Sequence, residues 1–287
     1  MNRIVLGGAQ LGLPYGILNG GETLSREEVA RILDTAAGHG IDSIDTAIAY
    51  GQSESVIGET AQNRFNIISK LPPLPSEVSN VSEWVYTQVD ASLARLNCKS
   101  LDALLLHRPQ DLVEQHGAEL YAAISSLKIK KIIHRFGISI YAPDELDGII
   151  EKFDIDVVQA PLNVFDRRIL EVIDQLTARS IEVHVRSVFL QGVLIASPKD
   201  RPQRFQPWSE HFAQFDTWVH STGLSAMACC LGFALQQPGV AKLVIGTTSA
   251  ESLAEIMNSV PNMYLEVPAD LRSSSEQLID PRIWSVA

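Results

Sequence analysis

Short apolar runs alternate with longer amphipathic segments along most of the chain. The short runs have the length of β-strands, whereas the segments between them repeat apolar side chains every three or four positions, as helices packed on a sheet do. In one such segment the apolar positions recur at a spacing of four, at Val81, Val85, Val89 and Leu93. This alternation is typical of a parallel sheet built from successive βα units.

The alternation predicts eight strands with a helix after each of them. We expect strands at residues 3–7, 41–44, 65–69, 101–106, 135–139, 157–159, 182–186 and 242–245. We expect helices after Ser25 and at residues 53–61, 81–96, 120–130, 143–152, 168–178 and 225–236, with another beginning near residue 250. In a chain of 287 residues, eight such units predict one α/β domain over residues 1–287. The expected architecture is a single (β/α)8 TIM barrel with its active site at the C-terminal face of the strands.

Two local signals refine this pattern. Ser25 and Glu28 have the spacing of a capping box, in which the hydroxyl accepts from the helix start and the carboxylate reaches back. After the seventh predicted strand, residues 189–223 form a connection too long for a bare βα loop. Its basic residues are Lys199, Arg201 and Arg204. A lid or clamp over the active face and a solvated loop with scattered charges both fit this segment.

Composition narrows the classes of partner. The chain has 23 Lys and Arg against 34 Asp and Glu, a formal net charge of −11, so we expect neither nucleic acid nor an anionic membrane surface as a partner. Cys98, Cys229 and Cys230 lack metal-ligand spacing, which favours reduced thiols and no bound metal. The N-terminal residues do not form a signal peptide and no apolar run reaches membrane-spanning length, so we expect a cytoplasmic protein.

Four side chains with acid–base chemistry stand at or just after the ends of consecutive predicted strands. Asp45 follows the second strand, Tyr50 lies five residues further on, Lys70 follows the third strand and His107 the fourth. Neighbouring barrel strands point such groups into one pocket. A phenol, with an ordinary pKa of about 10, donates its proton sluggishly at neutral pH unless a nearby cation eases its ionisation.

The other three residues supply what Tyr50 lacks. Lys70 is the cation, and a close carboxylate such as Asp45 keeps a buried ammonium charged. His107 hydrogen-bonds a carbonyl oxygen and directs it toward the phenol. The set therefore predicts proton delivery to a carbonyl group that becomes an alcohol. From the residues alone, a structural Asp45–Lys70 ion pair with His107 in a turn stays open, as does a Schiff-base lyase using Lys70, which the nearby Asp45 opposes.

The sequence resembles the aldo-keto reductase superfamily over nearly its whole length. The resemblance is carried by the order Asp, Tyr, Lys, His and by the fragments Asp45-Thr46-Ala47 with Tyr50-Gly51, Gly137-Ile138-Ser139 and Ile245-Gly246-Thr247-Thr248. It implies a catalytic tetrad of Asp45, Tyr50, Lys70 and His107, with Tyr50 as the proton donor. It also implies hydride transfer between a nicotinamide cofactor, usually NADPH, and a small-molecule aldehyde or ketone, in a monomer or small homo-oligomer.

The resemblance also implies where the cofactor binds. Ser139 and Gln159 match positions that hold the nicotinamide carboxamide, and Gly192 matches a clamp over the pyrophosphate. Arg186 stands where many members stack an aromatic ring, so it either alters hydride affinity, recruits an acidic substrate or satisfies loop carbonyls. The full implied set is Gly8, Ser139, Gln159, Arg186, Ser187, Gly192, Gly246, Thr247, Thr248, Ser249 and Glu255.

Three positions depart from the family pattern. Ile140 and Ile256 replace asparagines, and Ser252 stands where the usual arginine binds the 2′-phosphate. Ser249 reads as the cap of a helix whose N-terminus would face that phosphate, with nearby threonine hydroxyls. The resemblance implies NADPH as the cofactor. Because the arginine for the 2′-phosphate is not matched, NADH is possible as well. Ile140, Arg186 and Ile256 also leave open a second class, a regulatory or interaction protein that binds nicotinamide nucleotide with little turnover.

Overall fold

A closed barrel of eight parallel strands forms the centre of the molecule. The structure is a computed structural model that describes residues 3–14, 16–17 and 23–284. The strands are β1 (Ile4–Gly7), β2 (Ser43–Asp45), β3 (Asn66–Leu71), β4 (Leu101–Leu106), β5 (Ile133–Ser139), β6 (Val157–Pro161), β7 (Glu182–Arg186) and β8 (Val240–Gly246). They pair in sequence order, and β1 closes the ring against β8. The predicted TIM barrel is confirmed.

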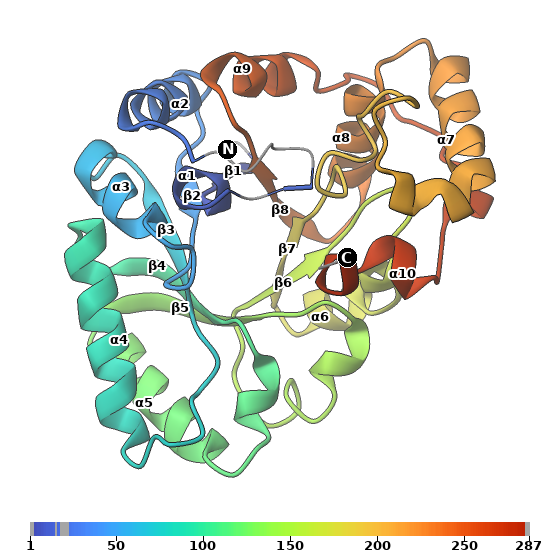
Figure 1. The fold of residues 1–287 in the computed structure, drawn as a ribbon. Helices are drawn as coiled ribbons and strands as arrows, with labels where there is room; N and C mark the ends of the chain where they lie inside the picture. The colour runs from blue at the N-terminus through green and yellow to red at the C-terminus, as the bar shows by residue number, and fades with distance from the viewer. Residues whose placement is uncertain (1–2, 15, 18–22, 285–287) are drawn as a thin grey trace.

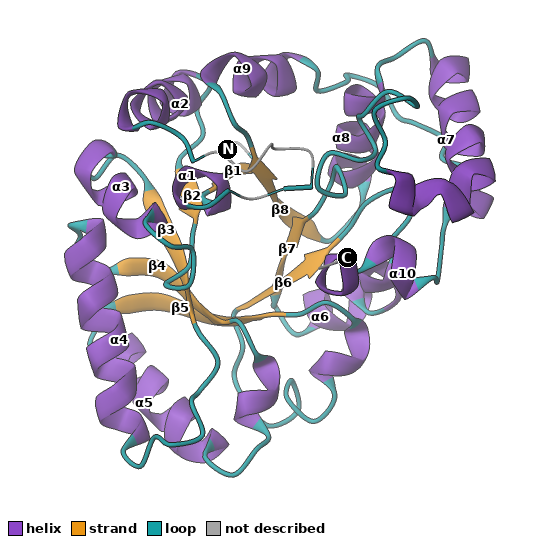
Figure 2. Ribbon diagram, viewed as in Figure 1, coloured by secondary structure: helices purple, strands orange, loops and turns teal. Residues whose placement is uncertain are grey.

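Helices surround the barrel (Figures 1 and 2). They are α1 (Ala9–Gly12), α2 (Arg26–Gly38), α3 (Ser53–Thr60), α4 (Val81–Leu96), α5 (Gly117–Ile129), α6 (Ile173–Ala178), α7 (Ser209–Thr222), α8 (Ala226–Gln236), α9 (Ala250–Asn258) and α10 (Glu276–Ile279). The apolar stripe of α4 explains its place, because Val81, Val85 and Val89 are all buried against the sheet.

The core has two parts. One cluster fills the barrel itself, with Val5, Ile68 and Ala103 among its buried members. The larger cluster lies between the strands and the helices. Because the strands are covered on both faces, they read as nearly continuous apolar runs, as in the Leu101–Leu106 segment.

The predicted helix at residues 143–152 is wrong. Residues 143–146 form a 3₁₀ helix, and turns follow as far as residue 152. Gly148 has a φ of +72°, a left-handed conformation that an α-helix cannot contain. Another predicted helix, at residues 168–178, is divided into a 3₁₀ helix at Arg168–Glu171 and the shorter α6.

The long connection after β7 contains a helix of its own. A 3₁₀ helix at Gln203–Trp208 leads into α7, so the description of residues 189–223 as one loop is wrong. Arg201 donates to Asp216 at 2.7 Å and Arg204 donates to the carbonyl of Trp284, so both arginines tie parts of the fold together. Within the described residues, no single helix is long and apolar enough to cross a membrane; residues 203–222 and 226–236 meet that test only when joined across an 88° bend.

The capping box of α2 is half correct. The Oγ atom of Ser25 accepts from the backbone N–H of Glu28 at 3.2 Å, as predicted. The Glu28 carboxylate, however, accepts from the backbone N–H of Ala250 at 2.8 Å and forms an ion pair with Arg31. It therefore joins α2 to the start of α9.

Candidate active site

The C-terminal ends of β2, β3 and β4 bring together the four residues expected to handle the proton. Asp45 ends β2, Lys70 lies in β3, and His107 follows β4. Tyr50 lies in the loop between β2 and α3, where its ring centroid is 5.6 Å from that of His107 and 5.2 Å from the Lys70 Nζ atom. All four side chains thus lie around one point at the barrel mouth.

Asp45 and Lys70 form a buried ion pair. The Lys70 Nζ atom donates to Asp45 Oδ2 at 2.5 Å and to the carbonyl of Thr46 at 2.9 Å, with side chains only 1% and 5% exposed for Lys70 and Asp45. The second carboxylate oxygen, Oδ1, accepts from Gln159 Nε2 at 2.7 Å. Burial lowers the pKa of Lys70, and the negative charge of Asp45 opposes that change.

The environment sets the protonation of the other two residues. Burial, followed by the charge of Asp45, raises the pKa of Tyr50, so the phenol keeps its proton at neutral pH. Burial, followed by the charges of Lys70 and Arg186, lowers the pKa of His107 to about 3. His107 is therefore a neutral imidazole at neutral pH, with one N–H donor.

Close backbone contacts fix the loop that carries Tyr50. A Cβ atom on Gly12 would lie 2.0 Å from the backbone nitrogen of Ser53, so only glycine allows α1 to approach this loop. Gly51 has a φ of +55°, and a Cβ atom there would lie 2.7 Å from the carbonyl oxygen of Gly12. The Ser53 hydroxyl then donates to the carbonyl of Gly8 at 2.7 Å.

A buried carboxylate that the sequence analysis missed anchors α3. Glu54 is 1% exposed, and it accepts hydrogen bonds from Ser69 at 2.7 Å and Ser92 at 2.6 Å. Arg95 donates to its other oxygen through two nitrogens, at 2.9 and 2.7 Å. The network ties α3 to β3 and α4 directly after the Tyr50 loop. Its members lie up to 41 positions apart, so no local motif marks it.

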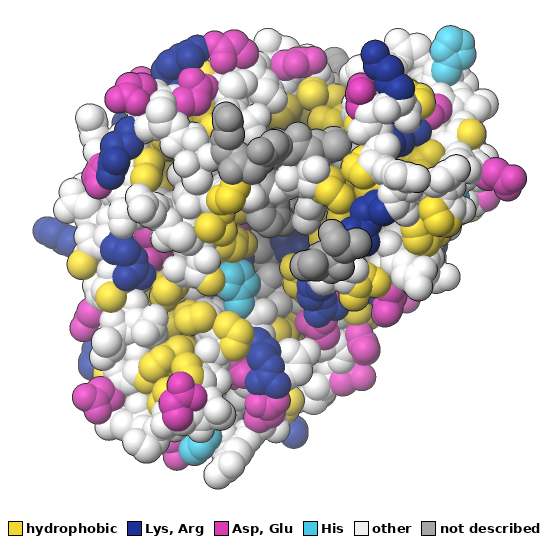
Figure 3. Space-filling view, in the orientation of Figure 1, with side chains coloured by type: hydrophobic (Ala, Val, Ile, Leu, Met, Phe, Trp, Pro, Cys, Tyr) yellow, Lys and Arg dark blue, Asp and Glu magenta, His cyan; other side chains and the backbone are white. Residues whose placement is uncertain are grey.

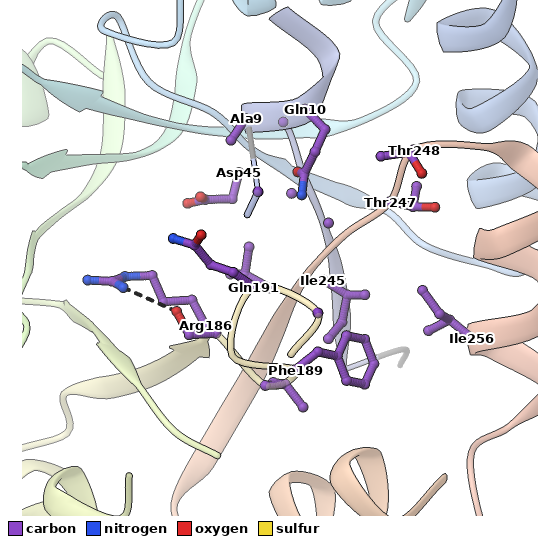
Figure 4. Close-up of a pocket in the computed structure, with 18 of the residues that line it drawn as sticks. Ala9, Gln10, Asp45, Arg186, Phe189, Gln191, Ile245, Thr247, Thr248 and Ile256 are labelled. Atoms are coloured by element: carbon purple, nitrogen blue, oxygen red, sulfur yellow. Dashed lines mark hydrogen bonds between the residues drawn. The ribbon is translucent and has the colours of Figure 1, made fainter. Parts of the chain in front are cut away.

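A cleft runs from the buried ion pair to the start of α9 (Figure 4). The predicted cofactor residues that line it are Gly8, Arg186, Ser187, Gly192, Gly246, Thr247 and Thr248. Lining residues that the sequence analysis missed include Gln10, Phe189 and Gln191. In Figure 3 the same face of the molecule is hollowed near its centre, with basic and histidine side chains at the border of the hollow.

Four predicted cofactor residues lie outside the described lining of this cleft. Ser139 and Gln159 are paired across β5 and β6 and are buried. Ser249 caps α9, because its Oγ atom accepts from the backbone N–H of Ser252 at 3.0 Å. Glu255 lies exposed on α9.

The shape and polarity of the cleft fit a nicotinamide dinucleotide. The Gln159 Oε1 atom is buried and has no hydrogen-bond partner among the described residues, so an amide N–H₂ group would satisfy it. A Cβ atom on Gly246 would lie 2.4 Å from the side-chain oxygen of Gln10, so the Gln10 side chain lies directly against this part of the wall. Ser187, Leu190 and Gln191 have φ values of 61°, 49° and 54°, a strained backbone of the kind that shapes binding sites.

A carboxylate lies at the start of α9, where a phosphate was expected. The Thr247 hydroxyl donates to the carbonyl of Ser249 at 3.0 Å, so it is engaged within its own turn. Glu28 accepts from the first N–H of α9, at Ala250. Arg31 contacts both Glu28 and Glu251, so two carboxylates face one guanidinium there.

The fold and the site are those of a TIM-barrel oxidoreductase, with the Asp45–Lys70 pair, Tyr50 and His107 at one end of the cleft. The chain belongs to the aldo/keto reductase family, whose model matches residues 3–266. Members of this family carry out NAD(P)H-dependent carbonyl oxidoreduction, and this protein is accordingly an NAD(P)-dependent oxidoreductase.

Individual relatives agree with this assignment. The chain is 26% identical over 250 residues to the uncharacterized oxidoreductase YqkF of Bacillus subtilis, covering 80% of this chain and 81% of that protein. It is 26% identical over 278 residues to D-arabinose 1-dehydrogenase of Saccharomyces cerevisiae, covering 88% and 81%. An aldo-keto reductase of Bacillus halodurans, solved in its holo form, has the same fold with a TM-score of 0.74 at 20% identity, covering 94% and 89%.

Proposed function

We propose that this protein interconverts a small aldehyde or ketone and the corresponding alcohol, with Tyr50 as the proton donor for reduction. The observation that carries the proposal is the buried Asp45–Lys70 pair, whose ammonium group lies 5.2 Å from the ring centroid of Tyr50. A charged lysine beside a phenol stabilises the phenolate that remains once the proton has moved to the substrate oxygen. Asp45 keeps that lysine charged.

His107 orients the substrate in this proposal. Its neutral imidazole donates an N–H to the carbonyl oxygen and directs that oxygen toward the Tyr50 hydroxyl. A neutral donor suits this role, because a charged imidazolium beside Lys70 would add a second positive charge to a buried site. The His107 pKa of about 3 keeps the ring neutral over the physiological range.

The cofactor would lie along the cleft. Gln159 and Ser139 would hold the carboxamide, and the glycine-lined wall at Gly8 and Gly246 would admit the rest of the molecule. Bound there, the nicotinamide ring supplies the hydride for reduction or accepts it in the reverse direction.

NADPH, expected from the resemblance, stays a prediction, and the α9 end gives reasons to favour NADH. Ser252 offers no positive charge, and the Glu28 carboxylate occupies the Ala250 N–H at the start of the helix. An anionic 2′-phosphate would meet that negative charge. We therefore propose that NADH is accepted at least as well as NADPH.

The substrate is proposed to be a small, polar carbonyl compound such as a sugar. This choice is supported by the family membership and by two relatives, D-arabinose 1-dehydrogenase of Saccharomyces cerevisiae and 6-dehydroglucose reductase of Novosphingobium aromaticivorans. The match to 6-dehydroglucose reductase covers only 42% of this chain.

The direct test follows nicotinamide absorbance with a panel of aldehydes, α-keto compounds and sugars. Tyr50→Phe should lower kcat by about 10²- to 10⁴-fold while leaving cofactor affinity close to that of the wild type. Tyr264→Phe, at a side chain that is 78% exposed, is the matched control. Equal turnover by wild type and Tyr50→Phe would show that another group donates the proton. Tight cofactor binding without turnover of any compound would favour the nucleotide-binding regulatory role.

A further inference from the structure

Arg186 ends β7 and places its guanidinium group near the proton-handling residues. Its Nη2 atom donates to the carbonyl of Ile140 at 3.0 Å, and its Nη1 atom donates weakly to Ser187 Oγ at 3.4 Å. Its Cζ atom lies 4.1 Å from the ring centroid of Tyr141. Within the described residues these contacts fix the plane of the group and use two of its five N–H donors.

The positive charge of Arg186 is not balanced by a carboxylate within the described part of the chain. The neighbouring charges balance one another instead. Lys70 is paired with Asp45, and Arg282, which also stacks on the Tyr141 ring, is paired with Asp280. A half-buried cation without a counter-ion is unfavourable unless a ligand supplies the anion.

The guanidinium group faces the substrate end of the cleft. In Figure 4 it lies on the Asp45 side and extends away from Thr248 and Ile256, which line the α9 end. Its charge contributes to the lowered pKa of His107, which places it within electrostatic reach of the residue proposed to hold the carbonyl oxygen. It is therefore suited to a group on the substrate rather than to the phosphates of a dinucleotide.

We propose that Arg186 binds an anionic substituent of the carbonyl substrate, a carboxylate or a phosphate monoester, and so selects anionic aldehydes or ketones. The proposal rests on the carbonyl chemistry proposed above and names its substrate class. A planar guanidinium presents paired N–H donors that match the oxygens of both anions. Because the whole protein carries a net charge of −11, its overall field does not attract an anion, and a local cation must do so.

The test compares substrate pairs that differ in charge. Succinic semialdehyde is compared with its methyl ester, and glyceraldehyde 3-phosphate with glyceraldehyde. The ratio of kcat/KM values within each pair cancels any effect of a substitution on the cofactor. The wild type should favour the charged member of at least one pair by roughly 10- to 100-fold, the range of a charge-assisted hydrogen bond. The pair that responds identifies the anion as carboxylate or phosphate.

Three variants assign that preference to Arg186. Arg186→Gln should bring the ratio close to one, and Arg186→Lys should retain part of it, since a point charge replaces the planar fork. Arg179→Gln is the control, because it removes the same charge from an exposed residue at the opposite end of β7 that donates to the carbonyl of Ile150. Arg179→Gln should keep the wild-type ratio.

Calorimetric titration with succinate and with glycerol 3-phosphate separates the two proposals. Binding to the wild type and not to Arg186→Gln, without turnover of any aldehyde, would retain the anion site and reject the proposed reaction. Turnover of neutral aldehydes with no charge preference in either pair would retain the reaction and reject the anion site. An equal preference for the charged substrate in the wild type and in Arg186→Gln would also reject the anion site at Arg186.

Discussion

The Nζ atom of Lys70 lies 2.5 Å from Oδ2 of Asp45, in a pair whose side chains are almost wholly excluded from solvent. Burial lowers the pKa of the lysine, and the charge and hydrogen bond of Asp45 oppose that shift. Gln159 holds the other oxygen of the carboxylate and thereby fixes the direction of the pair. The positive charge beside Tyr50 thus depends on a residue that the substrate need not touch.

Asp45→Asn should destabilise the fold and abolish turnover. The substitution leaves the Lys70 ammonium buried without its counter-charge, which costs about 3–5 kcal/mol of unfolding free energy. Urea denaturation measures the loss. The double variant Asp45→Asn/Lys70→Met removes both charges and should regain much of the stability while staying inactive. An Asp45→Asn protein as stable as the wild type would show that the pair contributes little.

His107 should make the fold less stable in acid. Its folded pKa of about 3 lies below the ordinary 6.5, so between these values the unfolded chain binds a proton that the folded protein does not. The contribution of His107 to the free energy of unfolding is therefore fully present above pH 6.5. It falls as the pH drops toward 3, by up to about 1.4 kcal/mol per pH unit. Urea unfolding at several pH values, compared with His107→Asn, isolates this contribution. Parallel pH profiles for the two proteins would contradict it.

Glu54→Gln should cost far more than the loss of an exposed ion pair. The substitution leaves the Arg95 guanidinium without its partner at a carboxylate that is only 1% exposed, so we expect a loss of about 3–5 kcal/mol. It should also lower kcat, because α3 begins directly after the Tyr50 loop. Glu59→Gln breaks the solvent-exposed pair with Arg26 and should lower the unfolding free energy far less than Glu54→Gln does. Similar unfolding midpoints for the two variants would refute the anchoring role.

The choice of dinucleotide should respond to charge at the start of α9. Ser252→Arg and Glu28→Gln should each increase the affinity for NADPH relative to NADH, by roughly tenfold if about 1.4 kcal/mol of repulsion is relieved. Fluorescence titration with each cofactor gives the ratio of Kd values. Glu27→Gln, which removes the same charge from an exposed neighbour of Glu28, should leave the ratio unchanged. A wild type that binds only NADPH would contradict the reasoning.

Much of the fold could be predicted because its signal is local and repeated. Buried strands and amphipathic helices each have their own period, and the resulting order of elements leads directly to the barrel. The prediction failed at residues 143–152, where Gly148 adopts a left-handed conformation that ends the helical pattern. It also failed at α7, where Phe212, Phe215 and Trp218 form a buried face inside a segment whose length and scattered charges indicate a loop.

The grouping of the four candidate residues could be predicted because three of them stand at or just after the ends of consecutive strands. The structure brings Asp45, Tyr50, Lys70 and His107 together, as their positions after consecutive strands indicate. The contacts that could not be predicted join distant segments. The Glu28 carboxylate on α2 accepts from the backbone N–H of Ala250 at the start of α9, 222 positions away. No spacing in the sequence predicts a contact between two such distant helices.

The hydrogen bond between Gln159 and Asp45 spans 114 positions of sequence and joins two halves of the barrel with different duties. The four residues proposed to move the proton all lie before residue 108, whereas Arg186 and most of the cleft wall toward α9 come from the second half of the chain. On the proposed mechanism, substitutions in the second half that keep Gln159 can change which nucleotide or substrate is accepted while the four residues proposed to move the proton stay in place. A half-barrel exchange with a relative would therefore have to keep the contact between Gln159 and Asp45.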